Sequence, residues 1–487
     1  MSQSHSIWRR VGVVGAVVLL GVGGLAILAP AANAAPVVGC SAPNLVAAID
    51  RANADPGADV INLAVGCTYR LIAAVGASSN GLPIVTGELT VNGRGATIAR
   101  AMQAPNFRIF TVSDTASLTL NATNLRNGRA SDCPGDPLGF IVACGGAIEN
   151  FGTLNINDSH VDGNNVNSAA DGGFDAEGGA IENFGTLNIK RSRFDSNSGT
   201  TTGPAALLFV AGGAISNEGT LSVDTTALTN NAIRLFGTGT LGGDEYQEGD
   251  GAAISSFGPA TITKSFINGN HTYGSAGNDF TSGAVQNGLS TMTISATSIT
   301  NNGATSRLGA AHGGGVISVG RLSVLTIRDS LIAGNEVDAP ALAPPAAGCM
   351  PETRSVASGG GVYVVRGTAT ITSTAVITNS VRAEGGCGDA KAGGLHNQGG
   401  TMTLNAVAVL ANSVFGDPAS GGGIDNDKTA LSLTIDQSTI SGNVVTGSPS
   451  SGGGIANHST GPFTITRSHV SRNTPDNCSP TSSACTG

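Results

Sequence analysis

The sequence predicts an all-β fold, a right-handed parallel β-helix of about 11–13 coils with a short N-terminal capping helix. Three observations favour this fold class. A short phrase returns ten times along the chain, glycine makes up 72 of 487 residues, and charged residues fall to 12%. With 40% hydrophobic residues and so little charge, the composition is not that of a disordered chain.

The repeat starts at residue 145 and keeps a nearly fixed register. Each unit opens with small residues, as in Gly-Gly-Ala-Ile, and ends that phrase on a first apolar anchor. A second anchor follows 8 to 11 residues later, a third comes 5 residues after the second, and an asparagine comes 3 residues after the third. These asparagines are Asn164, Asn197, Asn231, Asn270, Asn302, Asn335, Asn379, Asn412, Asn443 and Asn473.

This register indicates three short strands in each unit, because alternation such as Leu154-Asn155-Ile156 places apolar side chains on one face. One unit cannot close a core alone, but stacked units can, with equivalent strands pairing about 4.8 Å apart. The remaining segments vary in length, so they should lie together on one flank as loops. A horseshoe of leucine-rich repeats fits less well, because the leucine-rich signature and helical segments are missing.

Two columns of asparagine should run up the stack, and we assign both a structural role. The asparagines that end the units are expected to bond to one another through their side-chain amides. The second column comprises Asn150, Asn183, Asn217, Asn287, Asn397, Asn426 and Asn457, with Ser256 and Ser318 as substitutes. The glycine pair before each first strand fits a corner that needs a positive φ and leaves no room for a Cβ.

The segment before the repeats predicts a lid for the open end of the solenoid. Leu45, Ala48, Ile49 and Ala52 recur at helical spacing, and Asp55-Pro56-Gly57 ends the helix. The expected layout is a cap over residues 37–72, irregular coils over 73–144, ten regular repeats over 145–473 and a tail over 474–487. Residues 35–487 would then form a single domain.

The first 34 residues are typical of a signal peptide. Arg9 and Arg10 precede an apolar run, and the small residues that follow predict cleavage between Ala34 and Ala35. Two alternatives stay open, since the apolar run is long enough for a retained anchor and Cys40 ends a passable lipoprotein motif. The mature chain is expected to be secreted or held at the cell surface, without a further membrane segment.

The eight cysteines of an exported chain are interpreted as disulfides. Their positions suggest four pairs: Cys40–Cys67, Cys133–Cys144, Cys349–Cys387 and Cys478–Cys485. The third pair joins variable segments of adjacent coils, which the register makes neighbours. No CxxC spacing occurs, so a zinc site is not expected.

The formal net charge of −9 argues against a nucleic-acid partner, because phosphate backbones need a clustered basic surface. We expect a monomer whose partner is an extracellular glycan or a surface protein.

The residues from Cys40 to Leu71, with Ala-Ile-Asp-Arg-Ala-Asn-Ala-Asp-Pro-Gly-Ala-Asp-Val-Ile-Asn-Leu and Gly-Cys-Thr-Tyr-Arg-Leu, resemble bacterial secreted right-handed β-helix repeat proteins. The unit Gly-Gly-Ala-Ile-x-Asn-x-Gly-Thr-Leu is similar to the passenger repeats of polymorphic outer-membrane proteins. The resemblance covers nearly the whole mature chain and implies a pectin-lyase-like β-helix outside the cell. It implies little about activity, since most such relatives have none defined.

The residues just after the first anchors form a column that we interpret as outward-facing and solvated. Its members are Glu149, Glu182, Ser216, Ser255, Gln286, Ile317, Tyr363, His396, Asp425 and Ala456. Glu149 and Glu182 should stack about 5 Å apart, the separation found in retaining glycosidases. Because the column holds no basic partner for them, we expect both to titrate almost normally, and we assign no catalytic residue.

Three further groups were weighed for chemistry. The loop from Asp244 to Asp250 offers oxygens that could hold Ca²⁺, the one cofactor the sequence suggests. An arginine group could bind an anionic sugar and comprises Arg321 and Arg366, with Arg307, Arg354 and Arg382 nearby. We interpret the histidines of the coils as surface residues: His160, His271, His312, His396, His458 and His469.

For function, the sequence favours a non-enzymatic, adhesin-like scaffold that binds a surface, partner or glycan through its variable flank. The alternative is a polysaccharide-active enzyme, either a lyase or a glycoside hydrolase, since the same fold carries both roles. An enzyme would need a groove with clustered acids, arginines and aromatic residues. Aromatic residues make up only 4% of this chain.

Overall fold

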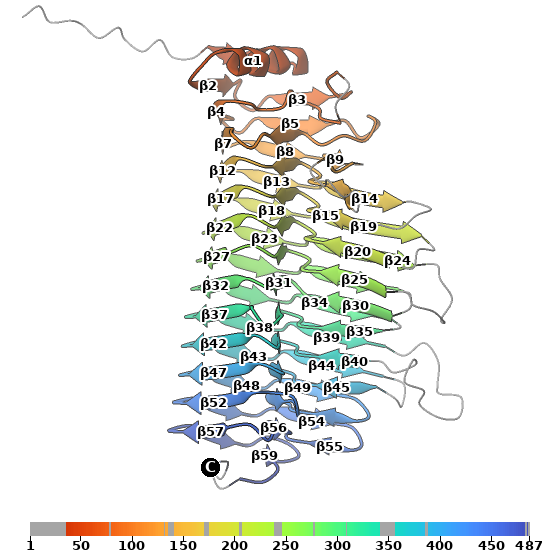
Figure 1. Cartoon of the computed structure of the whole chain (residues 1–487), viewed down its shortest axis with the longest axis vertical. Helices are drawn as coiled ribbons and strands as arrows, with labels where there is room; N and C mark the ends of the chain where they lie inside the picture. Colours follow the sequence, from red (N-terminus) through yellow and green to blue (C-terminus); the bar gives the residue numbers. More distant parts are fainter. Residues whose placement is uncertain are drawn as a thin grey trace, which may run out of the picture. The chain divides into compact units, whose positions relative to one another are not determined.

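Each coil begins where the glycine-rich phrase turns the chain into a short strand. The computed structural model of the chain describes residues 36–76, 79–130, 132–134, 141–169, 175–203, 207–237, 246–275, 278–307, 309–340, 356–384, 388–482 and 485. In these residues one helix, α1 (Ala42–Ala54), precedes a stack of strands in five parallel sheets. The protein is a parallel β-helix, so the predicted fold class is confirmed (Figure 1).

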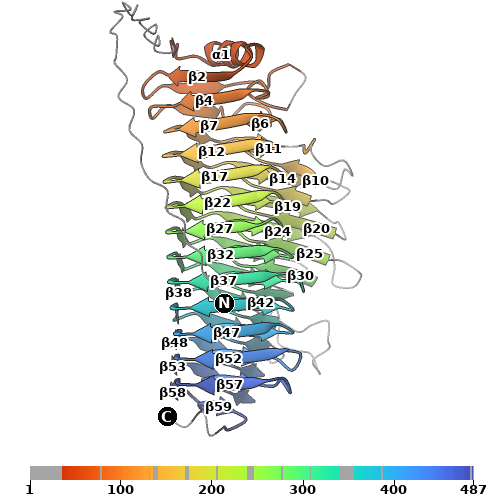
Figure 2. The same ribbon diagram turned by 60° about the vertical axis from the view of Figure 1, so that its left-hand side comes forward.

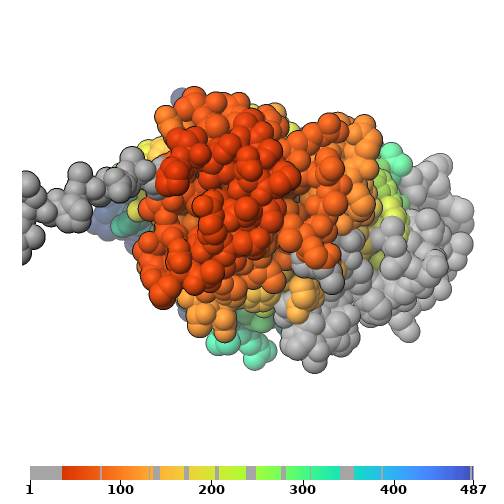
Figure 3. Space-filling view, turned by 90° about the horizontal axis from the view of Figure 1, so that it is seen from above, coloured from red at the N-terminus to blue at the C-terminus, as the bar shows by residue number. Residues whose placement is uncertain are grey.

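Helix α1 covers the N-terminal end of the stack, as its sequence predicts (Figure 1, Figure 3). Ser41 is its N-cap and accepts a hydrogen bond from the backbone N–H of Asn44 at 3.3 Å, which satisfies one free donor of the first turn. The buried face consists of the residues at helical spacing, Leu45, Ala48, Ile49 and Ala52. These side chains join the main apolar core and shield the first coils from solvent.

Three of the sheets enclose the main core, and we number them in the order in which a coil visits them. Sheet 1 comprises β6 (Phe110–Val112), β11 (Ile148–Asn150), β16 (Ile181–Asn183), β21 (Ile215–Asn217), β26 (Ile254–Ser256), β31 (Val285–Gly288), β36 (Val316–Val319), β41 (Val362–Val365), β46 (Leu395–Gln398), β51 (Ile424–Asn426), β56 (Ile455–Asn457) and β59 (Cys478–Ser479). Sheet 2 comprises β1 (Val37–Val38), β2 (Ala58–Leu63), β4 (Glu88–Asn92), β7 (Ser117–Asn121), β12 (Thr153–Asn157), β17 (Thr186–Lys190), β22 (Thr220–Asp224), β27 (Ala260–Thr263), β32 (Thr291–Ser295), β37 (Val324–Arg328), β42 (Thr368–Thr372), β47 (Thr401–Asn405), β52 (Ser432–Asp436) and β57 (Phe463–Thr466). Sheet 3 comprises β3 (Thr68–Leu71), β5 (Thr97–Arg100), β8 (Asn124–Arg126), β13 (His160–Asp162), β18 (Arg193–Asp195), β23 (Ala227–Thr229), β28 (Phe266–Asn268), β33 (Ser298–Thr300), β38 (Leu331–Ala333), β43 (Ala375–Ile377), β48 (Ala408–Leu410), β53 (Thr439–Ser441) and β58 (His469–Ser471).

The register predicted from the repeat is confirmed. Ile148 of β11 pairs with Ile181 of β16, and Ile156 of β12 pairs with Ile189 of β17, so anchor stacks on anchor. Figure 2 shows the strands of sheet 2 one above another along the stack. Apolar anchors of sheets 1 to 3 point inward and form one continuous core, with no contribution needed from the variable segments.

The variable flank differs from the prediction, because two further sheets stand where loops were expected. Sheet 4 comprises β9 (Arg129–Ala130), β14 (Asn165–Ala169), β19 (Ser198–Gly203), β24 (Ala232–Gly237), β29 (His271–Gly274), β34 (Gly303–Ser306), β39 (Glu336–Ala339), β44 (Ser380–Ala383), β49 (Ser413–Phe415) and β54 (Val444–Thr446). Sheet 5 comprises β10 (Ile141–Cys144), β15 (Asp175–Glu177), β20 (Leu207–Ala211), β25 (Tyr246–Asp250), β30 (Asn278–Ser282), β35 (Ala310–His312), β40 (Val356–Ser358), β45 (Asp389–Lys391), β50 (Ala419–Ser420) and β55 (Ser450–Ser451). Small apolar side chains pack between them in two clusters of their own.

The predicted asparagine ladder is confirmed along the whole stack. In a typical step, Asn302 Nδ2 donates to Asn335 Oδ1 at 2.9 Å and to the carbonyl of Ile267 at 3.0 Å. The backbone N–H of Asn302 also donates to Asn335 Oδ1, at 3.1 Å. Each buried amide is therefore saturated by the neighbouring coils, which explains why this position is asparagine in all ten units.

The glycine corner between sheets 5 and 1 has the conformation that the sequence predicts. Gly178 has a φ of +64°, and a Cβ on Gly179 would lie 2.0 Å from the carbonyl oxygen of Gly213 in the next coil. Both positions therefore exclude larger residues. The tight corner folds sheet 5 back over sheet 1, and this placement creates the candidate site described below.

Three of the four expected cysteine pairs are bonded in the structure: Cys40–Cys67, Cys133–Cys144 and Cys478–Cys485. Cys349 and Cys387 lie outside the described residues, as do Ala34 and Ala35. Among the described residues, no helix is long and apolar enough to cross a membrane.

Candidate functional site

The side chains that follow the first anchors are buried, so their interpretation as solvated residues is wrong. Sheet 5 covers them, and the last residue of a sheet 5 strand faces the second residue of the next sheet 1 strand. We call these two facing rows the flank column. Contacts across it include Ser420 Oγ to Asp425 Oδ2 at 2.5 Å and Ser216 Oγ to Glu177 Oε2 at 3.1 Å. The flank column is thus a second, polar interior beside the apolar core.

Glu149 lies at the N-terminal end of the flank column and is fully buried, contrary to the expectation of a free carboxylate. Its carboxylate forms an ion pair with Arg108, whose Nη1 lies 2.9 Å from Glu149 Oε2. Arg108 is itself only 1% exposed. The arginine comes from an irregular coil that lacks the repeat phrase, so the repeat register could not place it beside Glu149.

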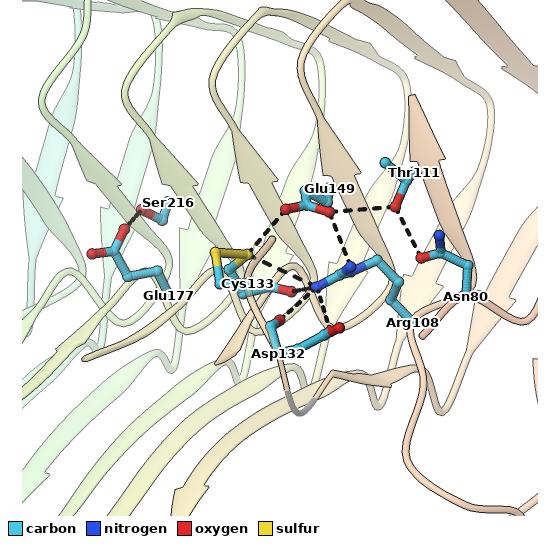
Figure 4. The surroundings of a disulfide bond; sticks show 9 residues. Asn80, Arg108, Thr111, Asp132, Cys133, Glu149, Glu177 and Ser216 are labelled. Atoms are coloured by element: carbon cyan, nitrogen blue, oxygen red, sulfur yellow. Dashed lines mark hydrogen bonds and ion pairs between the residues drawn. A yellow bond between two sulfur atoms is a disulfide. The ribbon is translucent and has the colours of Figure 1, made fainter. Parts of the chain in front are cut away.

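Figure 4 shows how the surroundings of the Cys133–Cys144 disulfide hold this arginine. Arg108 Nη2 donates to the carbonyl of Asp132 at 2.6 Å and to the carbonyl of Cys144 at 3.1 Å. Thr111 lies next to the Glu149 carboxylate, and its hydroxyl donates to Asn80 Oδ1 at 2.9 Å. Both terminal nitrogens of Arg108 find partners within the protein, and among the described residues only its buried Nε has none. The charge of Glu149 is thus compensated internally, which indicates a structural role.

Acidic side chains continue the column beyond Glu149. Burial raises the pKa of Glu182 well above its ordinary value, and the nearby Glu177 carboxylate adds to the effect. Burial also raises the pKa of Asp250, reinforced by Glu248, although Gln286 donates to Asp250 Oδ2 at 2.6 Å. The expectation that Glu182 titrates normally is therefore wrong, because sheet 5 removes the solvent that would stabilise its charge.

The C-terminal half of the flank column gathers groups of a different kind. Tyr363 of β41, His396 of β46 and Asp425 of β51 occupy successive steps of sheet 1. The rings of Tyr363 and His396 stack with their centroids 4.8 Å apart, and His396 Nε2 lies 3.6 Å from Asp425 Oδ1. All three are nearly or fully buried, and neither ring nitrogen of His396 makes a hydrogen bond.

Two cations complete this cluster. His458, just after β56, places its Nε2 3.5 Å from Asp425 Oδ2. Lys391 ends β45 and sits five residues before His396, the same offset that separates Cys144 from Glu149. Its Nζ lies 3.3 Å from Asp389 Oδ2 and 3.9 Å from Asp427 Oδ2. The geometry thus joins two histidines, a tyrosine, a lysine and carboxylates.

These side chains line two neighbouring hollows on the flank, which share Lys391. A hollow of about 390 Å³ has Tyr363, Lys391 and His396 on its wall. Lys391 also lines a second hollow of about 540 Å³, together with His458 and Asp427. Volumes of this size are typical of small-molecule sites.

The protonation states in the cluster diverge, as they do at catalytic sites. Burial lowers the pKa of His396 against the opposing pull of Asp425, so the imidazole is uncharged near neutral pH. Burial raises the pKa of Tyr363, which keeps its phenol protonated. Burial opposes the charge of Lys391, but Asp389 and Asp425 outweigh it and raise the pKa of its ammonium group.

Asp425 and His458 form a charged pair beside the uncharged imidazole. Burial alone would raise the pKa of Asp425, but hydrogen bonding from His458 outweighs burial and lowers it. The same interaction with Asp425 raises the pKa of His458. Asp425 therefore stays ionised and favours the tautomer of His396 that carries its proton on Nε2.

The six histidines do not share one environment. His312 and His396 are buried, which corrects their interpretation as surface residues, and burial lowers the pKa of His312 to about 3. His271, His458 and His469 are exposed, as expected, and His160 is half-buried. The buried pair faces the flank column because sheet 5 ends on His312 and sheet 1 places His396 at its second position.

The arginine group is brought together only in part. Arg321 and Arg366 line one hollow of about 710 Å³. Arg307 instead lies over the ring of Tyr273 at 5.7 Å, and Arg382 lies over Phe415 at 5.3 Å and pairs with Glu384. Arg354 lies outside the described residues.

Two clusters in the described residues have the donor set of a metal site. Cys133, Cys144 and Glu149 form one, but the two sulfurs are bonded to each other and cannot act as thiolate ligands. His396, Asp425 and Asp427 form the other. There the ammonium of Lys391 already compensates the carboxylates, so we assign no metal. Asp244 and Glu245 of the suggested Ca²⁺ loop lie outside the described residues.

Sequence reasoning placed Tyr363, His396 and Asp425 in one column but missed their burial and their partners. Lys391 carried a usable signal, because its offset of five residues from His396 repeats that of Cys144 and Glu149. Arg108 and His458 carried none. Their positions depend on an irregular coil and on a turn, where the repeat gives no register.

Comparison with known proteins gives one structural likeness. No protein family profile and no curated protein sequence matches the chain. Among solved structures, the A-module of a mannuronan C-5 epimerase from Azotobacter vinelandii is similar, with 14% identity over 88% of this chain and 94% of that one. The TM-score is 0.36, and at that score the likeness says nothing about the activity of this chain.

Proposed function

We propose that the protein is a polysaccharide-active enzyme that cleaves a uronate-containing glycan by β-elimination, with His396 and Tyr363 as its acid–base pair. One observation carries the proposal. An uncharged buried imidazole, a protonated phenol and an ammonium group meet on the wall of one hollow. Convergence of groups with shifted pKa values in a cleft is typical of a catalytic centre.

The base of the reaction is His396. Its lowered pKa leaves a free lone pair near neutral pH, and the Asp425 carboxylate lies 3.6 Å from Nε2, which leaves Nδ1 as the basic nitrogen. The imidazole removes the proton from the sugar carbon next to the carboxylate. The electron pair of that C–H bond forms a C=C bond, and the glycosidic C–O bond on the neighbouring carbon breaks.

The acid and the cation complete the elimination. Tyr363 keeps its proton because burial raises its pKa. Its hydroxyl donates to Gln398 Oε1 in the structure, and in the reaction it transfers that proton to the departing glycosidic oxygen. The ammonium of Lys391, which also contacts Asp389 and Asp427, attracts the carboxylate of the sugar and stabilises part of the negative charge that develops when the carbon proton leaves. His396 then releases to solvent the proton that it took, and the Tyr363 phenolate takes a proton from solvent.

Elimination fits the cluster better than hydrolysis does. A glycoside hydrolase needs a carboxylic acid that remains protonated and donates to the leaving group. The pKa of Asp425 is instead lowered, so this carboxyl group is an orienting anion and a poor acid. The expectation of a non-enzymatic scaffold assumed that acids and bases are dispersed along the coils and that the histidines are exposed. In the C-terminal cluster these groups lie together and His396 is buried, so neither assumption holds there.

The site of action is proposed to be outside the cell. Three disulfides in the described residues suit an oxidising compartment, and their cysteines occur in a chain whose first residues are typical of a signal peptide.

The test is turnover of polyuronates by the purified chain. Polygalacturonate, alginate and chondroitin are incubated separately, and the ultraviolet absorbance of unsaturated uronate is followed. At least one substrate should give unsaturated ends, and His396→Gln and Tyr363→Phe should each lower kcat by about 100-fold or more. His469→Gln is the matched control, because this exposed histidine lies on sheet 3, and it should retain full activity.

Three outcomes contradict the proposal. The first is the absence of unsaturated product from every polyuronate. The second is full turnover by His396→Gln. The third is the appearance of new reducing ends without unsaturation, which would indicate hydrolysis.

A further inference from the structure

A third hollow, next to the proposed catalytic groups, is lined by two arginines that make no ion pair in the described part of the chain. Arg321 and Arg366 line this hollow of about 710 Å³. Among the described residues, neither guanidinium group makes an ion pair, whereas several other arginines do, such as Arg126 with Asp162 at 2.7 Å. What sets Arg321 and Arg366 apart from other described arginines without an ion pair is that both line the same hollow.

The arginines reach the hollow from equivalent turns of adjacent coils. Arg321 follows β36 and Arg366 follows β41, and these strands pair through Val316 and Val362. Gly399 occupies the position of Arg366 in the next coil. A Cβ there would lie 3.2 Å from Arg366 Cγ, so the absence of a side chain leaves room for the arginine. The stacking of coils therefore sets both charges on one wall.

The rest of the lining suits a sugar. Thr368, Thr401 and Thr429 contribute hydroxyl groups, and Leu431 contributes an apolar surface. Guanidinium groups bind carboxylate or sulfate oxygens through paired hydrogen bonds, so two free arginines select a ligand with acidic groups.

This hollow borders the one lined by Tyr363 and His396. Val365 and Gln398 line both hollows and form their shared border. A glycan bound across the border would place one sugar at the reacting groups and another sugar at the arginines.

We infer that the hollow lined by Arg321 and Arg366 is a second anionic subsite, which binds a carboxylate or sulfate on a sugar beyond the one that reacts. This inference rests on the proposed function for the identity of the neighbouring site, although binding can be measured without turnover. The substrate class it assigns is a polysaccharide with acidic groups on more than one sugar.

The test is binding to the His396→Gln chain, which prevents turnover. A galacturonate oligosaccharide, a sulfated chondroitin oligosaccharide and a neutral cello-oligosaccharide are titrated separately by calorimetry. One acidic oligosaccharide should bind, the neutral one should not, and Arg321→Gln and Arg366→Gln should each weaken binding about 10-fold. Because chondroitin carries glucuronate carboxylates as well as sulfates, the same titration with desulfated chondroitin distinguishes a carboxylate from a sulfate.

Arg70→Gln is the matched control, because this exposed arginine of β3 carries the same charge and makes no ion pair among the described residues. Equal weakening by Arg70→Gln, unchanged binding by the Arg321→Gln/Arg366→Gln variant, or failure of both acidic probes to bind would overturn the inference. The proposed function fails separately, when polyuronates bind through the arginines but no variant or wild-type chain forms an unsaturated product.

Discussion

The guanidinium group of Arg108 lies 2.9 Å from the carboxylate of Glu149, and solvent reaches neither side chain. The pair joins an irregular coil to the first regular repeat, next to the Cys133–Cys144 disulfide. It fixes the start of the flank column, because every later coil takes its register from the one before.

The first prediction concerns this pair. Arg108→Met leaves a buried carboxylate without its cation and should lower the free energy of unfolding by about 3–5 kcal/mol. Urea denaturation measures the change. Arg108→Met combined with Glu149→Leu should recover most of the loss, since the orphaned charge is then gone. If the free energy of unfolding of Arg108→Met lay within about 0.5 kcal/mol of the wild-type value, the pair would not stabilise the fold.

The second prediction concerns the asparagine ladder. Asn302→Ala leaves three buried groups without their partner: the carbonyl of Ile267 and the side-chain amide and backbone N–H of Asn270. Each such group should lower the free energy of unfolding by about 1–3 kcal/mol. The urea midpoint should fall accordingly. Asn188→Ala is the control, because this half-buried residue of β17 makes one outward side-chain bond to Asn155. Asn188→Ala should lower the free energy of unfolding by less than about 1 kcal/mol. If both variants lost the same free energy, the inner ladder would not contribute more to stability than an outward hydrogen bond.

The third prediction is a fall in stability as the pH rises. Glu182 holds its proton in the folded chain because burial raises its pKa, whereas the unfolded chain releases that proton near the ordinary value of 4.5. Above that value the unfolded state binds fewer protons, so the free energy of unfolding decreases by about 1.4 kcal/mol per pH unit until the folded pKa is passed.

Urea denaturation at a series of pH values checks this dependence. Glu182→Gln should make the slope above pH 4.5 shallower, since the amide has no proton to lose, and the slope due to Asp250 remains. Glu88→Gln, at an exposed position of β4, should leave the slope unchanged. A profile that Glu182→Gln does not alter would mean that this carboxyl group finds a cation in the folded chain.

The fourth prediction concerns the charged pair of the C-terminal cluster. Asp425→Asn removes the anion that raises the pKa of His458, so that pKa should fall to or below 6.5. Nuclear magnetic resonance titration of labelled histidines measures it, with exposed His469 as an internal reference. In the wild type, the pair stabilises the fold below pH 6.5, and this contribution is lost as the pH rises through the folded pKa. An unchanged pKa of His458 would remove Asp425 from its positioning role.

Much of the fold follows from local patterns. The spacing of Leu45 and Ile49 predicts the capping helix, because a helical face repeats every 3.6 residues regardless of context. The eight-residue interval from Ile156 to Asn164 predicts the coil, because equal intervals place equal side chains above one another. The ladder follows from the same interval, since an amide needs only its equivalent in the next coil as a partner.

The flank column was decided by tertiary structure. The strands of sheets 4 and 5 vary in length, and many of their buried residues are small, such as Ala304 and Ala357. They therefore lack the regularly spaced large apolar residues by which a strand is predicted. The last residues of sheet 5 face sheet 1 across the glycine corner, so Glu149 and His396 lie in an interior and not on the expected surface, and the loss of solvent then sets their charges. Sequence alone determined which side chains share a column, because covalent spacing fixes the register within a coil. Only the packed chain decided which of them lie beside Arg108 or Lys391, because those neighbours come from segments that the register does not constrain.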